Sequence, residues 1–412
     1  MTPRTPEIGD NLARIRRRRG LTQEQLAERA SVSVSVIRKL ERGDRESASL
    51  PTLRKLAAAL GVTTVELFAP VPRFDDRVDV DDRADMFAIR RALQPARTLA
   101  GPAVPTLADD GDAPTLVALR STVREVNGMF RDSDYAGAIA ATPTALAHGR
   151  RTVAALEGDD QLTAWAQVAQ AYQTAAMVLI QLRREDLAWT ALGLAMDAGR
   201  AAGDDVLVAA AVCTENWLLT RQGRFDEAET AALHSAESIE PSLTRSPLAQ
   251  VAVFGWLNLG AAAAATRNNR PEVAADALRR ARAAAYVAAP FESPDVAHWT
   301  ALSPPVVAVR EVELAMVTGD VDTAMRSARD VPDDMRPAVT HQRFRLDVAA
   351  AHTERREYND ALAVLLQLRQ AVPGWLRYQR YARSIADRLL HARPRSVPAE
   401  LRELAEFLDL AA

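Results

Sequence analysis

A short pattern recurs six times between residues 135 and 361, and it constrains the fold more than any other feature of the 412-residue chain. Each time, a polar or Gly-bearing turn is followed by a helix start with Ala at the fourth position. A small residue there lets the two helices of a hairpin approach closely. The six segments are Tyr135–Ala138, Glu185–Ala188, Phe225–Ala228, Pro271–Ala274, Val321–Ala324 and Tyr358–Ala361.

The spacing of these alanines indicates stacked helical hairpins. They are separated by 50, 40, 46, 50 and 37 residues, which is room for two helices and their turns. The pattern resembles degenerate tetratricopeptide (TPR) repeats, lengthened beyond the usual ~34 residues, and covers about residues 115–390. A generic α-solenoid is the alternative. The ending "PAELRELAEFLDL" is typical of the terminal helix that such arrays need.

The first 69 residues carry the apolar stripes of short amphipathic helices. Ile8, Leu12 and Ile15 share one helical face. Further stripes follow in "LTQEQLAERA", in "IRKLERG" and around Leu56, and "TTVEL" is expected to form a short fifth helix. The sequence from Thr22 to Gln25 fits a capping box, in which side chains satisfy free N–H groups at a helix start.

Residues 31–36 read "SVSVSV", an alternation that is typical of a β-strand. A strand between two short helices would have no partner, and an isolated strand is not stable. We therefore expect a turn at Ser31 and Val32, followed by a helix that Ser33 caps. Val32 would fill the corner between the helices, and Ile37 and Leu40 would face the core.

The stretch "LTQEQLAERASVSVSVIRKLERG" resembles the helix-turn-helix of the XRE family of bacterial regulators, which is related to the phage lambda repressor. The resemblance covers about residues 8–69 and implies a five-helix, lambda-repressor-like domain. Ser31 stands where the tight turn usually carries Gly, so we expect a positive φ there. Val34 stands where the recognition helix often has a polar residue, and it could pack on a thymine methyl.

By this resemblance, the helix that begins at Ser33 enters the major groove of DNA. The run Arg16–Arg19 would either contact phosphates or complement the helix dipole. Base edges would be read by Ser35, Arg38 and Lys39, with Arg38 on a guanine. Phosphates would be held by Thr22, Gln23 and Arg42.

Charge supports a nucleic-acid partner for this head. Residues 1–69 hold 13 basic and 8 acidic side chains, whereas the rest holds 38 basic and 46 acidic. A basic head on an acidic body suggests contact with a polyanion. The segment 70–114, with six prolines and one expected helix in "VDVDDRADMFAIRRAL", is predicted to be a linker to a body over residues 115–412. Met86, Phe87 and Leu93 of that helix need a covering surface.

Polar side chains in the expected inner helices are candidates for binding an effector. Asn216 and Asn258 lie twelve and sixteen residues before their repeat alanines, about one helical turn apart in phase. We therefore expect both in one channel, with Tyr172 and Arg345 as further contacts, where amide and guanidinium groups could grip a peptide backbone and carboxylate. The alternative is that each buried Asn bonds to a neighbouring turn.

No enzymatic motif is present: there is no Gly-x-x-x-x-Gly-Lys loop, Gly-x-Ser-x-Gly elbow or His-Glu-x-x-His pair. The six histidines are scattered, and Cys213 is the single cysteine, so we expect no metal, no cofactor and no catalysis. The N-terminus lacks an apolar signal, and the stretch "VAVFGWLNLGAAAAA" is shorter than a membrane span. These features predict a cytoplasmic protein.

An XRE-like head on a TPR-like body resembles the peptide-sensing quorum regulators of Gram-positive bacteria. That resemblance implies an all-α, homodimeric transcriptional regulator that binds double-stranded operator DNA and senses a peptide or small molecule. The alternative is an adaptor whose body binds a partner protein and tethers it to DNA. An open groove with polar side chains would favour the sensor, and a closed, Ala-packed groove would favour the adaptor.

Overall fold

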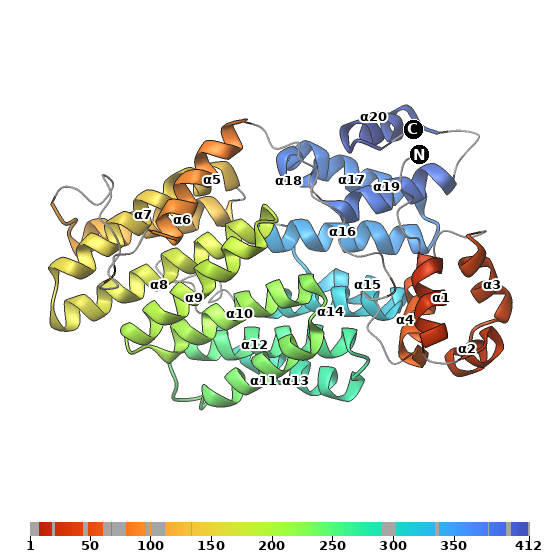
Figure 1. Ribbon diagram of the computed structural model, residues 1–412, viewed down its shortest axis with the longest axis horizontal. Helices are drawn as coiled ribbons and strands as arrows, with labels where there is room; N and C mark the ends of the chain where they lie inside the picture. Colours follow the sequence, from red (N-terminus) through yellow and green to blue (C-terminus); the bar gives the residue numbers. More distant parts are fainter. Residues whose placement is uncertain are drawn as a thin grey trace.

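The computed structural model describes residues 8–18, 21–43, 48–60, 67, 80–95, 99, 112–132, 134–289, 302–333, 338–377, 379–392 and 397–410. Every regular element within these ranges is helical, and none of them contains a strand (Figure 1). The expected all-α fold is confirmed. Most of the expected fifth helix of the head lies outside the described residues, although its last residue, Leu67, is described and is buried in the head core. Most of the segment 98–114 also lies outside the described residues.

The head has its own hydrophobic core. Leu12, Leu26, Ile37 and Leu56 are fully or almost fully buried in it, and they come from four successive helices. Amphipathic helices this short depend on such packing for their stability. The four helices are α1 (Ile8–Arg18), α2 (Gln23–Ala30), α3 (Val34–Arg42) and α4 (Leu50–Leu60).

The alternating stretch is a turn and a helix start, as expected. Ser31 ends α2 with φ 49° and ψ 47°, in the left-handed region. The amides of Ser31 and Val32 donate to the carbonyls of Glu28 and Ala27, which closes the helix. Ser33 is the N-cap of α3, but its side chain makes no capping bond. Its hydroxyl instead lies 2.6 Å from the Ser35 hydroxyl.

The linker helix α5 (Val80–Leu93) packs on the body, against α7 and α9. Met86, Ile89 and Leu93 are buried in the main core of the body. The body does not cover Phe87, which is 62% exposed and lies under the Arg91 guanidinium, 5.8 Å from its ring centre. Phe87 lies one position from Met86, so the packed face of the helix does not include it.

The body consists of consecutive helical hairpins whose second helices begin where the repeated pattern predicts. These helices start at Tyr135, Glu185, Phe225, Pro271, Val321 and Tyr358, and all six repeat alanines are buried. The hairpins are α6 (Leu116–Arg131) with α7 (Tyr135–Ala155), α8 (Gly158–Gln181) with α9 (Glu185–Ala201), α10 (Asp205–Gln222) with α11 (Phe225–Ser238), α12 (Leu248–Arg267) with α13 (Pro271–Ala288), α14 (Pro304–Thr318) with α15 (Val321–Ser327), and α16 (Ala338–Glu354) with α17 (Tyr358–Ala371).

Stacking of the hairpins creates an inner row of helices. Each first helix packs on the first helix of the next hairpin, from α6 through α8, α10, α12 and α14 to α16. This is the arrangement of TPR-like α-solenoids. Three further helices, α18 (Pro373–Arg377), α19 (Arg380–Ala392) and α20 (Ala399–Phe407), follow α17, and α20 packs on α17 and α19 at the C-terminal end of the array (Figure 1).

Helix α12 is apolar on all sides. Its 20 residues are long and apolar enough to cross a membrane by length and composition, but most of the helix is buried inside the body. The apolar stretch noted in the sequence is thus part of a longer helix than expected. All-round apolarity suits a helix at the centre of a large core.

The head contacts the body through α4, which packs on α14. Gly319 ends α14 with φ 80°, and a Cβ there would lie 2.5 Å from Pro51 Cγ at the start of α4. Arg54 of α4 lies near Arg267 of α12, and burial, followed by repulsion from Arg267, lowers the pKa of Arg54 to about 10. Figure 1 shows α2 and α3 on the side of the head that faces away from the body.

Candidate DNA-binding surface and internal cavity

The outward face of α3 carries the side chains that were expected to read DNA. Ser35, Arg38, Lys39 and Arg42 are exposed, and Val34 is half-buried. Ile37 and Leu40 point into the core, which fixes the phase of the helix. A helix that exposes a row of polar and basic side chains to solvent is suited to binding in the major groove of DNA.

Arg38 is held by an ion pair across the helix-turn-helix. Its guanidinium donates to Glu24 Oε1 on α2 at 2.7 Å, and both side chains are more than half exposed. A backbone hydrogen bond, followed by the bond from Arg38, lowers the pKa of Glu24. Exposed pairs of this kind are weak, so a base edge can replace Glu24 as the partner of Arg38.

Glu41 joins three helices of the head. It accepts two hydrogen bonds from Arg16 of α1 and one from the Gln23 amide of α2, each at 2.7 Å. Arg16 also donates to the Leu21 carbonyl and is only 9% exposed. Arg16 therefore stabilises the fold rather than facing a phosphate, and Gln23 keeps one amide N–H for other contacts.

The remaining expected contacts lie around the start of α2. Thr22 is exposed, its hydroxyl accepts from the Gln25 amide, and the Gln25 side chain accepts from the Thr22 amide. The capping box is confirmed. It leaves Thr22 at a helix N-terminus, where phosphate oxygens are favoured. The roles of these side chains on DNA stay predictions.

The inner helices of the body line a cavity of about 320 Å³ that is open to solvent on one side. Residues of α10 and α12 recur in its lining every three or four positions, as one face of each helix requires. The wall from these two helices comprises Cys213, Asn216, Trp217, Thr220, Arg221, Trp256, Gly260, Ala263 and Arg267. Helices α6, α8, α14, α16 and α18, together with Gln379, complete the lining, which combines aromatic, amide-bearing and charged residues.

Two charge clusters lie in the cavity wall. In the first, Glu313 pairs with Arg267 at 2.5 Å and with Arg310. Burial works to raise the pKa of Glu313, but the two guanidinium groups outweigh it and hold that pKa well below its usual range. A carboxylate between two guanidinium groups thus stays ionised throughout the physiological range.

The second cluster lies on α16 and α19. Asp347 lies 3.5 Å from Arg343, whose guanidinium stacks 4.5 Å from the Tyr381 ring centre. Burial raises the pKa of Asp347 to about 6, despite the opposing effect of Arg343. Asp347 is therefore the cavity group whose charge changes just below neutral pH.

Only one of the four expected effector residues lines this cavity. Asn216 does so, with its amide donating to the Ala228 carbonyl at 2.7 Å and its Oδ1 close to Gly260. Asn258 lies two residues from both Trp256 and Gly260, about 200° around the helix, and is fully buried on the opposite side. It donates to the Phe254 carbonyl of its own helix. The expected shared channel is therefore wrong for Asn258.

The other two expected residues also lie outside the lining. Tyr172 is buried in the main core. Arg345 lies two residues from Arg343 and from Asp347, so it points outward, where it bonds to Gln367. The cavity also has four arginines that were not predictable, because nothing in the sequence says which face of an Ala-rich helix turns inward: Arg221, Arg267, Arg310 and Arg343.

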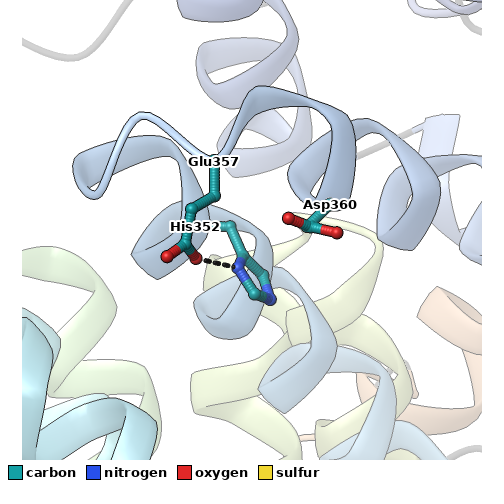
Figure 2. A group of neighbouring side chains, drawn as sticks. All are labelled: His352, Glu357 and Asp360. Atoms are coloured by element: carbon teal, nitrogen blue, oxygen red, sulfur yellow. Dashed lines mark hydrogen bonds and ion pairs between the residues drawn. The ribbon is translucent and has the colours of Figure 1, made fainter.

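Outside the cavity, His352, Glu357 and Asp360 gather at the turn between α16 and α17 (Figure 2). The histidines were expected to be scattered, so this grouping was missed. His352 Nδ1 lies 2.7 Å from Glu357 Oε2, and Arg355 Nε lies 3.0 Å from the other oxygen of the same carboxylate. Both Glu357 oxygens thus have cationic or hydrogen-bonding partners. These contacts close the turn between the two helices, and this structural role explains why the side chains lie together.

Comparison with known proteins identifies the head. A family model described as "Helix-turn-helix" matches residues 12–67. An uncharacterized HTH-type transcriptional regulator of Sinorhizobium fredii is 48% identical over 63 residues, which are 15% of this chain and 80% of that relative. The immunity repressor protein of Bacillus phage phi105 is 47% identical over 55 residues, 13% of this chain and 38% of the repressor.

A solved structure, Bacillus thuringiensis PlcR in complex with the peptide PapR7 and DNA, is similar over 85% of this chain and 98% of its own. Its identity is 12% and its TM-score 0.29, so it carries no argument about the body or its ligands. The sequence matches to the head have much higher identities, 48% and 47%, and they confirm the family expected from the motif. The chain belongs to the helix-turn-helix family of DNA-binding transcriptional regulators.

Proposed function

We propose that this regulator binds a small effector in the cavity of its helical-repeat body, and that occupancy of the cavity changes the affinity of the head for operator DNA. The observation that carries the proposal is the position of Arg267. This residue lines the cavity, pairs with Glu313, and lies near Arg54 on the head helix α4. A ligand that moves Arg267 therefore changes the electrostatic environment of Arg54 on the head helix that docks against the body.

On DNA, we propose that α3 lies in the major groove with Ser35, Arg38 and Lys39 toward the base edges. Val34 supplies an apolar contact for a thymine methyl. Thr22, Gln23 and Arg42 flank this face and hold phosphates. The exposure of the α3 side chains and the weak Arg38–Glu24 pair support this arrangement.

The protein acts as a homodimer in this proposal. One recognition helix covers few base pairs, and two-fold regulators of this kind read half-sites one DNA turn apart or a multiple of it. The proposed setting is the bacterial cytoplasm. Binding of two ligands, DNA and effector, is the whole of its activity, and no catalytic step is part of the proposal.

The chemistry of the cavity favours a sensor over an adaptor. A groove for a partner helix would present small apolar residues, whereas this wall carries Asn216, several arginines and two carboxylates around aromatic rings. Ligand sites for small molecules combine apolar walls with a few convergent polar groups. The effector is thus a peptide or small molecule that fits about 320 Å³.

A substitution that fills the cavity tests the coupling without knowledge of the effector. Thr220→Trp places a large ring in the cavity, and Thr244→Trp places the same ring on an exposed turn. The operator is first selected from random DNA. We expect Thr220→Trp to change operator affinity about 5- to 150-fold, the usual range of coupling between sites, and Thr244→Trp to leave it unchanged. A folded Thr220→Trp protein with wild-type operator affinity would contradict the proposal.

A further inference from the structure

The cavity lining has more cationic than anionic side chains, and one arginine lacks a carboxylate partner. Arg221, Arg267, Arg310 and Arg343 line the cavity together with two carboxylates, Glu313 and Asp347. Glu313 is shared by Arg267 and Arg310, and Asp347 is taken by Arg343. Arg221 has no carboxylate within ion-pair distance among the described residues, and its guanidinium lies 5.9 Å from the centre of the Trp217 ring.

Helix capping does not explain Arg221. The residue lies in the last turn of α10, where cations are favoured by the helix dipole. The turn that ends the helix is closed by the backbone, because the amides of Gly223 and Arg224 donate to the carbonyls of Thr220 and Leu219. The guanidinium is therefore not needed to close the helix.

The surroundings of Arg221 are positive. Arg221 lines the cavity with its side chain exposed to solvent. Partial desolvation, followed by the neighbouring Arg183, lowers the pKa of Arg221; Arg343 and Arg380 act in the same direction, and Glu185 opposes them. Glu185 is itself engaged by the Gln222 amide at 2.9 Å. At pH 7 Arg221 is still cationic, and it lies in a field that an anion would neutralise.

Polar and aromatic groups stand beside this charge. Gln181 and Gln379 are also in the lining of the cavity. Trp375, also in the lining, has a buried indole N–H with no acceptor among the described residues. Trp217 supplies apolar surface next to Arg221, and Met177 supplies apolar surface elsewhere in the same lining. A ligand complementary to this wall has an anionic end and an apolar or aromatic body.

We propose that the cavity is selective for organic anions, and that the Arg221 guanidinium binds the carboxylate or phosphate group of the ligand while Trp217 and Met177 pack on its apolar part. This inference rests on the proposed function of the cavity as the effector site. It adds the charge class of the effector and the residue that recognises it.

Two dyes that differ in charge test the selectivity. Anilinonaphthalene sulfonate is anionic, and N-phenylnaphthylamine is its uncharged counterpart. Their affinities are measured by fluorescence titration of the full-length protein and of Arg221→Gln, with Arg345→Gln as the matched control on the outer face of α16. We expect Arg221→Gln to weaken binding of the sulfonate about tenfold or more, as loss of a charge-assisted bond does, and to leave the neutral dye unchanged. Arg345→Gln should change neither affinity.

Competition with simple anions identifies the group that Arg221 holds. Phenyl phosphate and phenylpropionate are each titrated against the bound sulfonate dye, and displacement from the wild type but not from Arg221→Gln supports the assignment for that group. The proposal is overturned if Arg221→Gln weakens both dyes equally or neither dye, or if neither anion competes. These outcomes are separate from the Thr220→Trp operator measurement, which decides the proposed function regardless of charge selectivity.

Discussion

At the scale of single residues, Glu41 carries more of the head's architecture than its place in a basic recognition helix suggests. Its carboxylate lies between Arg16 and Gln23, and it ties α1 and α2 to α3. The position of the reading face of α3 therefore depends on a side chain that never touches DNA in the proposed arrangement.

Glu41→Gln should destabilise the head by about 2 kcal/mol, because it leaves the largely buried Arg16 without its counter-charge. Hydrogen exchange of the α1 and α3 amides measures the effect. Glu28→Gln, on the exposed face of α2, is the control and should leave exchange unchanged. Equal protection in the two variants would show that the Arg16–Glu41 pair contributes little.

Arg38→Ala should weaken specific operator binding by about 1–3 kcal/mol and relax the preference at one base position. The physical reason is the loss of a bidentate donor from the exposed face of α3. Selection from random DNA and gel-shift titration of each variant provide the measurement, with Arg345→Ala in the body as the control. An unchanged footprint and affinity would remove Arg38 from the reading set.

Asp347 predicts a pH dependence of anion binding. Its pKa of about 6 means that it is largely ionised at pH 7 and largely protonated at pH 5. Protonation removes a negative charge from a wall that also holds Arg343, Glu313, Arg267 and Tyr381. The sulfonate dye should therefore bind more tightly at pH 5 than at pH 7, and the neutral dye should not change.

Asp347→Asn is the control for this prediction. In Asp347→Asn, the sulfonate dye should bind at both pH 5 and pH 7 about as tightly as it binds to the wild type at pH 5, so that its affinity no longer depends on pH. A profile that persists in Asp347→Asn would assign the titration to another group.

At the scale of elements, the helices were predictable where their ends carry local chemistry. The capping box at Thr22 and the polar turns before each repeat alanine placed helix starts within a residue of where they occur. Helix phase around the cavity was not predictable. Asn216 and Asn258 share a phase relative to the repeat alanines, yet one faces the cavity and the other the core. The inward face depends on how hairpins rotate as they stack, and α12, apolar on all sides, carries no signal of it.

The turn between α2 and α3 provides a prediction at this scale. Ser31 has φ 49°, a conformation that strains a side chain and suits glycine. Ser31→Gly should stabilise the head by about 0.5–1 kcal/mol, measured by hydrogen exchange of the α2 and α3 amides. Glu28→Gly, inside α2, should act in the opposite direction by about 1 kcal/mol. Destabilisation by Ser31→Gly would mean that the serine side chain stabilises the turn.

At the scale of the whole molecule, the DNA-binding head docks on the helical-repeat body, in which we propose that the effector binds. Helix α4 packs on α14, and Arg54 lies near Arg267 in the cavity wall. The contact lies on the side of the head away from α3 (Figure 1), so the body does not obstruct the reading face. We therefore expect the body to affect DNA binding by changing the spacing or orientation of the two heads in a dimer.

The dimer is itself testable by sedimentation of the protein with its selected operator. We expect two chains on each operator, and half-sites separated by about one DNA turn or a multiple of it. A single chain bound to the full operator would rule out the dimeric arrangement.

The most direct test of the central claim is a linkage measurement between the two sites. Operator affinity is measured by fluorescence anisotropy with and without saturating sulfonate dye, and dye affinity is measured with and without saturating operator. If the cavity and the head are coupled, both affinities shift by the same factor, in the range of about 5- to 150-fold, because coupling free energies are reciprocal. Operator and dye affinities that are independent of each other, with both ligands bound, would contradict the account.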